Sequence, residues 1–327
     1  MWRRLAMTYL KHYGTVARTT LIGAALGIGS LASAEGLIGA SVADQKSLFY
    51  IAAVDGMRAA AAEAGLDINV ASANNNSREQ ISQVQNLLIQ QPEALLFISQ
   101  DSTAAAAGVR AANQAGVPVI AVDQRPESGD GEIVTFIATD SVKAARDLCT
   151  WLFDQMGGEG ELAILKGVLG STAEIQRTQG CNEALENYPG IEVVAIQTAN
   201  WDENEAFRAV QNILTANPGL DAVFGESDAM ALGAAKAARQ AGVEILSVGI
   251  DGFPTMLEAI EEGLVQATMA QIPYQMGQMA VADALKIMSG EGDSIPALQY
   301  QDAVLITQEN VGEFEPSDFY GPAADNM

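Results

Sequence analysis

Short apolar runs alternate with longer segments in which apolar residues recur at helical spacing, from residue 36 almost to the C-terminus. Runs that are apolar almost throughout are typical of strands buried on both faces of a sheet. Apolar residues at intervals of three and four positions predict amphipathic helices between them. In the first half the pattern predicts strands at 36–42, 67–72, 93–99, 117–123 and 133–138. Helices are predicted between them at 49–65, 77–91 and 102–116.

Capping residues support these helices. Ser77 and Ser102 stand where two of them begin, and a serine hydroxyl can accept a hydrogen bond from the first free backbone N–H groups. Gly65 and Gly116 stand where two helices end, because glycine readily adopts the left-handed conformation found there. Strands joined by helices in this way predict a parallel sheet covered on both faces.

The second half repeats the alternation, from DSVKAARDLCTWLFDQM through ELAILKG, IEVVAIQ and DAVFGE to EILSVGID and LVQATMAQ. One more helix, PYQMGQMAVADALKIMSG, precedes a strand pair around ALQYQDAVLIT. The acidic tail from Glu313 is expected to be a solvated surface segment. The predicted fold class is therefore α/β, with two lobes that are each a doubly wound parallel sheet.

Charge excludes one class of partner. The chain has 327 residues, enough for two domains, and 17 basic against 41 acidic side chains give a net charge of -24. A polyanion such as a nucleic acid would approach this protein against a repulsive field. We therefore expect no nucleic-acid partner.

The N-terminal segment 1–34 is predicted to be a signal peptide. Four basic residues precede the apolar run LIGAALGIGSLASA, and Ala32 and Ala34 frame a small-residue cleavage site. A membrane anchor is the alternative, but a spanning helix needs about 20 apolar residues and this run is shorter. No cysteine follows Ala34 directly, so no lipid anchor is indicated. The product is expected to be a soluble protein of the periplasm.

Cleavage would remove His12, the only histidine. Serine or cysteine catalysis through histidine and zinc sites with histidine ligands are then excluded, and no metal or cofactor is expected. The sequence GVLGST lacks the lysine of a phosphate-binding loop, so Ser171 or Thr172 is expected to cap a helix. Cys149 and Cys181 are compatible with one disulfide or with two buried thiols.

Polar and aromatic residues follow the apolar strands, and ligands of parallel sheets bind at the carboxyl ends of the strands. The candidates of the first half are Ser47, Phe49, Tyr50, Asp123 and Gln124. Those of the second half are Arg177, Trp201, Ser227, Asp251 and Gln271. Carboxylates accept from adjacent hydroxyls, guanidinium and amide groups donate to sugar oxygens, and aromatic rings pack on C–H faces. The set predicts a site for a polyhydroxylated small molecule.

Each candidate also has a structural interpretation. An aspartate that follows a strand often caps the next helix, which applies to Asp251 and, because Pro126 follows, less to Asp123. Phe49 and Trp201 are equally compatible with ordinary core aromatics. Arg125 follows Gln124 directly and is expected to point out of the cleft, since successive side chains of a strand face opposite ways.

Eight ordered segments resemble the periplasmic sugar-binding proteins of the ribose-binding type: LFYIAAVDGM, ASANNNSREQISQVQNLL, GVPVIAVD, IATDSVKAARDL, EIQRTQG, VFGESDAMALGA, SVGIDGFP and ATMAQIPYQMG. The resemblance implies two lobes joined by three crossovers, near Thr139, after Gln271 and near Ala303. It implies an N-terminal lobe of 35–139 plus 272–303 and a C-terminal lobe of 140–271 plus 304–327. It also implies a monomer that delivers a monosaccharide to the permease subunits of an ABC importer.

The resemblance assigns roles to seven of the candidates: Phe49 and Tyr50 as rings on one sugar face, Trp201 as the opposing ring, and Asp123, Arg177, Asp251 and Gln271 as polar contacts. Three positions depart from the family. Ser47 and Ser227 stand where the family has asparagine, and Gln124 stands where it has arginine. Shorter side chains enlarge the cleft and the lost guanidinium removes donors, so a sugar other than ribose is expected.

The leading hypothesis is a solute-binding protein for a neutral monosaccharide or polyol, without catalysis. One alternative is a periplasmic receptor that passes a furanose-like signal to a membrane sensor. Another is a secreted glycoside hydrolase that uses Asp123 and Asp251. The hydrolase is disfavoured because carboxylates beside Arg177 are expected to have lowered pKa values, whereas a general acid needs a raised one.

Overall fold

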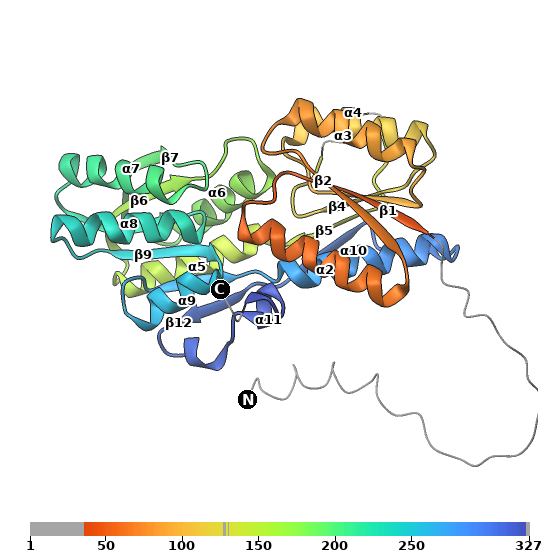
Figure 1. Cartoon of the computed structure of the whole chain (residues 1–327). Helices are drawn as coiled ribbons and strands as arrows, with labels where there is room; N and C mark the ends of the chain where they lie inside the picture. Colours follow the sequence, from red (N-terminus) through yellow and green to blue (C-terminus); the bar gives the residue numbers. More distant parts are fainter. Residues whose placement is uncertain (1–35, 127–128, 130, 325–327) are drawn as a thin grey trace, which may run out of the picture. The chain divides into compact units, whose positions relative to one another are not determined.

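The computed structural model describes residues 36–126, 129 and 131–324. The predicted signal peptide, 1–34, lies outside the described residues. No described helix is long and apolar enough to span a membrane. The described chain forms two six-stranded sheets with helices on both faces (Figure 1), which confirms the α/β class with two parallel-sheet lobes.

The first sheet has the strand order β11-β5-β4-β3-β1-β2, and every pair in it is parallel. Its strands are β1 (Leu37–Val42), β2 (Asp67–Ser72), β3 (Ala94–Phe97), β4 (Val119–Val122), β5 (Thr135–Thr139) and β11 (Leu298–Gln301). Helices α2 (Leu48–Ala64) and α10 (Pro273–Met288) pack together on one face. Helices α3 (Ser77–Ile89) and α4 (Ser102–Gln114) cover the other face, above the sheet in Figure 1.

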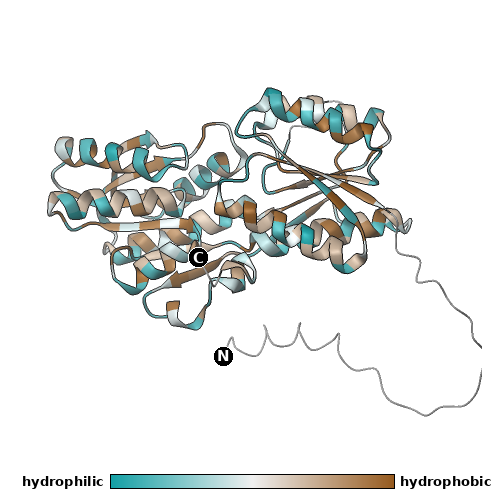
Figure 2. Ribbon diagram, viewed as in Figure 1, coloured by the Kyte–Doolittle hydropathy of each residue, from teal (hydrophilic) through white to brown (hydrophobic). Residues whose placement is uncertain are grey.

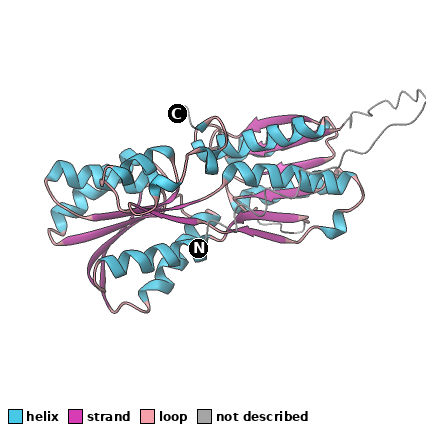
Figure 3. Cartoon of the chain, turned by 90° about the horizontal axis from the view of Figure 1, so that it is seen from below, coloured by secondary structure: helices cyan, strands magenta, loops and turns pink. Residues whose placement is uncertain are grey.

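The second sheet repeats this order as β12-β10-β9-β8-β6-β7. Its strands are β6 (Glu159–Lys166), β7 (Gly190–Thr198), β8 (Leu220–Gly225), β9 (Leu246–Asp251), β10 (Ala267–Ala270) and β12 (Val304–Thr307). Its helices are α5 (Ser141–Gln155), α6 (Thr172–Leu185), α7 (Glu203–Ala216), α8 (Asp228–Ala241) and α9 (Pro254–Glu261). Figure 3 shows strands with helices on both sides, and α5 pairs with α6 while α7 pairs with α8. Strand β12 runs antiparallel to β10, an exception to the predicted parallel sheet.

The strands of the predicted pair near the C-terminus do not pair with each other. β11 joins β5 in the first sheet, whereas β12 joins β10 in the second, although only Asp302 and Ala303 separate them. Both sheets reverse their strand order beside their first strand, between β1 and β3 and between β6 and β8. Such a reversal leaves a crevice at the carboxyl ends of the strands.

Buried apolar side chains explain the pairing of helices with sheets. Ile38, Leu96 and Ile120 of the first sheet are fully buried against α2 and α10, and Phe224 and Ile250 occupy the equivalent layer of the second sheet. Brown and teal residues alternate around the outer helices in Figure 2, as expected for helices with one face on a sheet.

Two predicted helix caps are wrong by one residue. Asn76 caps α3 by accepting from the backbone N–H groups of Arg78 and Glu79. Asp101 caps α4 in the same way. In both cases a longer acceptor precedes the serine, and the serine becomes the first helical residue. The predicted helix ends are confirmed, since Gly65 and Gly116 are left-handed, with φ of 71° and 74°.

The C-terminal tail is not the solvated segment that was predicted. It contains the short helix α11 (Ser317–Tyr320), in which Phe319 and Tyr320 are each 3% exposed. These rings join an apolar cluster with Met256 and Ile260 of α9. The prediction followed the acidic composition of the tail and missed the short apolar segment that contains Phe319 and Tyr320.

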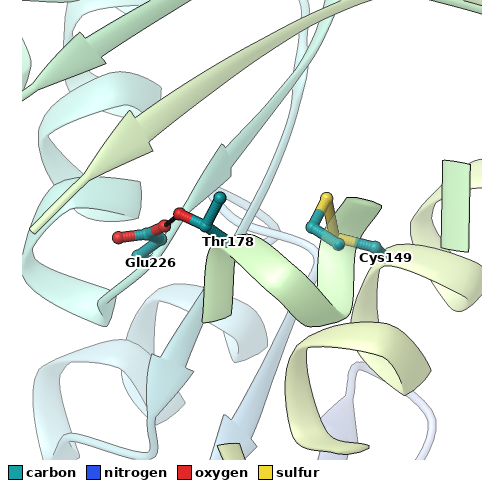
Figure 4. Close-up of a disulfide and its surroundings, with 4 residues drawn as sticks. Cys149, Thr178 and Glu226 are labelled. Carbon is teal, nitrogen blue, oxygen red and sulfur yellow. Dashed lines mark hydrogen bonds between the residues drawn. A yellow bond between two sulfur atoms is a disulfide. The ribbon is translucent and has the colours of Figure 1, made fainter. Parts of the chain in front are cut away.

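Cys149 of α5 and Cys181 of α6 form a disulfide, which decides between the two alternatives (Figure 4). Their Cα atoms are 5.5 Å apart and both side chains are fully buried. The bond fastens the two helices that cover one face of the second sheet.

Reducing this disulfide is expected to lower the free energy of unfolding by about 3 to 4 kcal/mol, because a cross-link of this span restricts the unfolded chain. The two cysteines are separated by 32 residues. Denaturant titration with and without dithiothreitol measures the effect, and dithiothreitol should not affect the variant Cys149→Ala/Cys181→Ala. Equal midpoints for the oxidised and reduced protein would contradict the expectation.

Candidate functional site

A cavity of about 580 Å³ lies where the carboxyl ends of both sheets meet, and residues of both lobes line it. Its size is that of a small-molecule site. All ten residues predicted from the strand ends line this one cavity: Ser47, Phe49, Tyr50, Asp123, Gln124, Arg177, Trp201, Ser227, Asp251 and Gln271.

The loop after β1 supplies the aromatic side. Asp44 Oδ1 accepts from the backbone N–H of Lys46 at 2.7 Å and of Ser47 at 2.9 Å, which fixes the turn into α2. The rings of Phe49 and Tyr50 are 5.6 Å apart between centroids and almost perpendicular, at 88°. Only one of the two can therefore lie flat against a given ligand face. Phe49 is 6% exposed and belongs to the core, which confirms its structural interpretation, and it also lines the cavity.

Asp123 and Gln124 follow β4. Asp123 adopts a left-handed conformation, with φ of 57°, and caps no helix. Among the described residues, no lysine or arginine nitrogen lies within 4.0 Å of its carboxylate. Gln124 Oε1 instead accepts from the backbone N–H of Thr172 in α6 at 3.0 Å, so this side chain joins the two lobes.

Arg125 does not line the cavity, as predicted. Its side chain is exposed and its guanidinium lies 5.7 Å from the ring centroid of Phe136. Its backbone N–H donates to the hydroxyl of Thr172 at 3.1 Å, a second contact between the lobes.

Arg177 of α6 is the central cation of the site. It is 4% exposed, and its Nη1 donates to the backbone oxygen of Glu226 and to Asp251 Oδ1, the latter at 3.4 Å. Its guanidinium lies 5.5 Å from the ring centroid of Trp201, within the range of a cation–π contact. That ring packs on Gly167, where the Cβ of any other residue would overlap it. Glycine at 167 thus allows Trp201 to reach the cavity.

Asp251 and Gln271 are the remaining predicted residues that the second lobe contributes to the cavity. Gln271 Nε2 donates to Asp251 Oδ1 at 2.8 Å, and Phe253, not Asp251, occupies the N-cap of α9. Within the described chain, Arg177 Nε and Gln271 Oε1 are buried without a hydrogen-bond partner. Buried polar atoms are nearly always paired, so these two atoms, in residues that line the cavity, are exceptions to a general rule.

The buried carboxyl groups of Glu226 and Asp228 do not line the cavity but bind backbone groups next to it. Glu226 Oε1 accepts from the hydroxyl of Thr178 at 2.6 Å, as Figure 4 shows, and its Oε2 accepts from Gly167 N–H at 2.8 Å. Asp228 Oδ2 accepts from the backbone N–H of Gly252 at 2.6 Å and of Phe253 at 2.9 Å. The Glu226 contacts hold Gly167, on which the Trp201 ring packs, and the Asp228 contacts hold the loop that follows Asp251.

Residues 38–292 match the family described as periplasmic binding protein domain. This chain belongs to the periplasmic binding protein family. It is 33% identical over 254 residues to the ribose import binding protein of Bacillus subtilis (strain 168), which covers 78% of this chain and 82% of that protein.

Solved structures of this family agree with the fold. A periplasmic solute-binding protein of an ABC transporter from Actinobacillus succinogenes, with bound D-allose, has a TM-score of 0.81 at 28% identity and covers 86% of this chain and 100% of that one. A solute-binding protein from Bacillus halodurans C-125, with bound myo-inositol, has a TM-score of 0.81 at 30% identity. The match covers 86% of this chain and 97% of that one. The resemblance to sugar-binding proteins is thereby confirmed.

The expected lowering of carboxyl pKa values in this periplasmic binding protein is wrong. Burial raises the pKa of Asp123 to about 6, and the nearby Arg177 offsets only part of that rise. Burial also raises the pKa of Asp251 above its ordinary value. Burial raises the pKa of Glu226 to about 7. The cost of burying a charge exceeds the attraction of the one guanidinium, so pKa values do not argue against a hydrolase.

Lowering the pH from about 8 to about 5.5 is expected to stabilise the ligand-free protein, with Asp123 contributing about 1 kcal/mol and Glu226 about 2 kcal/mol. Their folded pKa values, about 6 and about 7, lie above the ordinary values of 3.8 and 4.5. The folded state therefore binds more protons in this window, and this stability is lost as the pH rises through the folded pKa values. Urea titrations across the pH range measure the slope. Slopes as steep in Asp123→Asn and Glu226→Gln as in the unaltered protein would refute this account.

Several lining residues were not predicted: Asn75, Ser99, Gln100, Val168, Ala173, Asn200, Ala229 and Phe253. Ser99 and Gln100 follow β3 after Ile98, so the rule used for the other strand ends would have found them. Asn75 and Asn200 both have a positive φ, of 59° and 52°. They lie in turns, and the hydrophobic periodicity of strands and helices does not locate residues in turns. In the described part of the chain, no group of three or more His, Cys, Asp or Glu is placed to hold a metal ion.

Proposed function

We propose that this protein binds a neutral monosaccharide or polyol in the cavity between its lobes and delivers it to the permease subunits of an ABC importer. The observation that carries the proposal is the meeting of Asp123 from one lobe with Arg177 and Asp251 from the other in one cavity with aromatic walls. Carboxylates that accept from hydroxyls beside a guanidinium that donates match the alternating hydroxyls of such a ligand. Relatives with bound D-allose and myo-inositol support the ligand class.

We propose the ten predicted residues as ligand contacts, and 35–139 plus 272–303 and 140–271 plus 304–327 as the two lobes. The chain passes between the sheets after β5, β10 and β11. A ligand that contacts both lobes stabilises the closed arrangement, which the permease can then distinguish from the open one. The protein acts as a periplasmic monomer without catalysis, in keeping with a family of binding proteins.

A ligand other than ribose fits the three departures from the family best. Ser227 caps α8 by accepting from Met230 N–H at 3.4 Å, and Gln124 Oε1 is engaged by Thr172. Ser47 ends in a short hydroxyl where the family has an amide. Fewer donors therefore reach the ligand than in a ribose site.

A thermal-shift panel of D-ribose, D-allose, myo-inositol and related neutral sugars tests the proposal. A ligand present at about 100 times its Kd is expected to add roughly 2.7 kcal/mol to the free energy of unfolding. We expect D-ribose to shift the melting temperature less than a hexose or a cyclitol. No shift with any compound would contradict the proposed function.

A further inference from the structure

The hydroxyl of Tyr320, in the C-terminal helix α11, reaches the backbone of a site residue. Tyr320 is 3% exposed, and its hydroxyl donates to the backbone oxygen of Asp251 at 2.9 Å. The same oxygen accepts from Gln271 N–H at 3.0 Å. Two donors from distant parts of the chain therefore hold one peptide group beside the cavity.

This peptide needs support because of its conformation. Asp251 has a backbone φ of 153°, a value that residues other than glycine rarely adopt. Asp228 holds the next two N–H groups, of Gly252 and Phe253. The direction of the Asp251 carboxylate is thus set by contacts on both sides of its backbone, and Tyr320 supplies one of them.

The tail that carries Tyr320 is packed in a defined place. Gly321 has a φ of +80°, and the Cβ of another residue there would overlap the ring of Tyr274 at the start of α10. The rings of Tyr320 and Phe253 are 5.7 Å apart between centroids. Helix α11 also contacts α2 and α10 of the first lobe. The tail lies beyond residues 38–292, which match the family.

We propose that Tyr320 is a positioning residue of the ligand site, which holds the Asp251 carboxylate in the direction that the ligand requires. The proposal rests on the proposed function, because it assigns Asp251 to a ligand. Tyr320 does not line the cavity, so it acts on the ligand through Asp251.

The first test compares Tyr320→Phe, which removes only the hydroxyl, with Tyr300→Phe on the edge strand β11, where the ring is 45% exposed. Calorimetry with whichever of D-ribose, D-allose and myo-inositol binds most tightly measures Kd. We expect Tyr320→Phe to raise Kd about tenfold and Tyr300→Phe to leave it unchanged. In an Asp251→Asn background, Tyr320→Phe should change Kd less than twofold, because the residue through which it acts is already altered.

An unchanged Kd in Tyr320→Phe, or an equal loss in both backgrounds, would overturn the proposal. A merely structural role predicts the second result, since its effect would add to that of Asp251→Asn.

Amide hydrogen exchange provides a test that needs no ligand. Peptides that span 249–254 and 268–272 should exchange several-fold faster in Tyr320→Phe, while 37–42 in the first sheet should be unaffected. Unchanged exchange in the first two peptides would also overturn the proposal. If the unaltered protein binds no compound of the whole panel, the proposed function fails, and exchange still decides whether Tyr320 holds Asp251.

Discussion

Arg177→Ala is expected to weaken ligand binding by about 2 to 5 kcal/mol, which corresponds to a loss of roughly thirtyfold to several thousandfold in Kd. Arg177 is almost fully buried and is the one cation in contact with Asp251 among the described residues. Its removal takes a donor from the ligand and leaves a buried carboxylate without its partner. The loss of the partner accounts for much of the expected effect.

Calorimetric titration with the best compound of the panel measures this change. Arg208→Ala is the matched control, because Arg208 lies in the same lobe, is exposed and does not line the cavity. Arg177→Lys should recover part of the affinity, since an ammonium restores the charge without the planar set of donors. An Arg177→Ala protein that binds as tightly as Arg208→Ala would show that the ligand lies elsewhere.

Asp228→Ala is expected to lower the free energy of unfolding by about 3 to 5 kcal/mol, because three donors lose their acceptor inside the protein. The carboxyl group is fully buried and accepts from Gly252 N–H, Phe253 N–H and the hydroxyl of Thr268, the last at 2.7 Å. Thr268 Oγ1 also lies 3.2 Å from Gly252 N and can replace part of what is lost.

Asp228→Asn separates shape and hydrogen bonding from charge. Its amide oxygen can accept from Gly252 and Phe253, and its NH₂ group can donate to Thr268 after the hydroxyl turns. We therefore expect this variant to stay within about 1 kcal/mol of the unaltered protein in urea titrations. A loss in Asp228→Asn as large as in Asp228→Ala would mean that the negative charge, and not the acceptor geometry, stabilises this loop.

The order of strands and helices could be predicted because hydrophobic periodicity reports burial directly. The strands of the first sheet all overlap the predicted ranges, and the carboxyl-end rule placed ten candidates that line one cavity. The same rule applied to β3 would have added Ser99 and Gln100. Pattern and topology together therefore locate a cleft of this fold well.

Interactions between distant segments were not predictable. The raised pKa of Asp123 depends on its burial in the folded chain, which the pattern of hydrophobic positions does not report. The engagement of Gln124 by Thr172 joins residues 48 positions apart, and no periodicity encodes it. The tail was misjudged because its acidic composition outweighed Phe319 and Tyr320, whose burial depends on an apolar cluster built by other elements.

A crystal structure with the tightest-binding sugar or polyol of the panel would show whether both lobes contact the ligand. We expect one ligand in the cavity between the lobes, within hydrogen-bond distance of Asp123 from one lobe and of Arg177 and Asp251 from the other. Arg177 Nε and Gln271 Oε1 should each gain a partner from the ligand. A ligand bound outside this cavity, or one that touches a single lobe and leaves both carboxylates without contact, would contradict it.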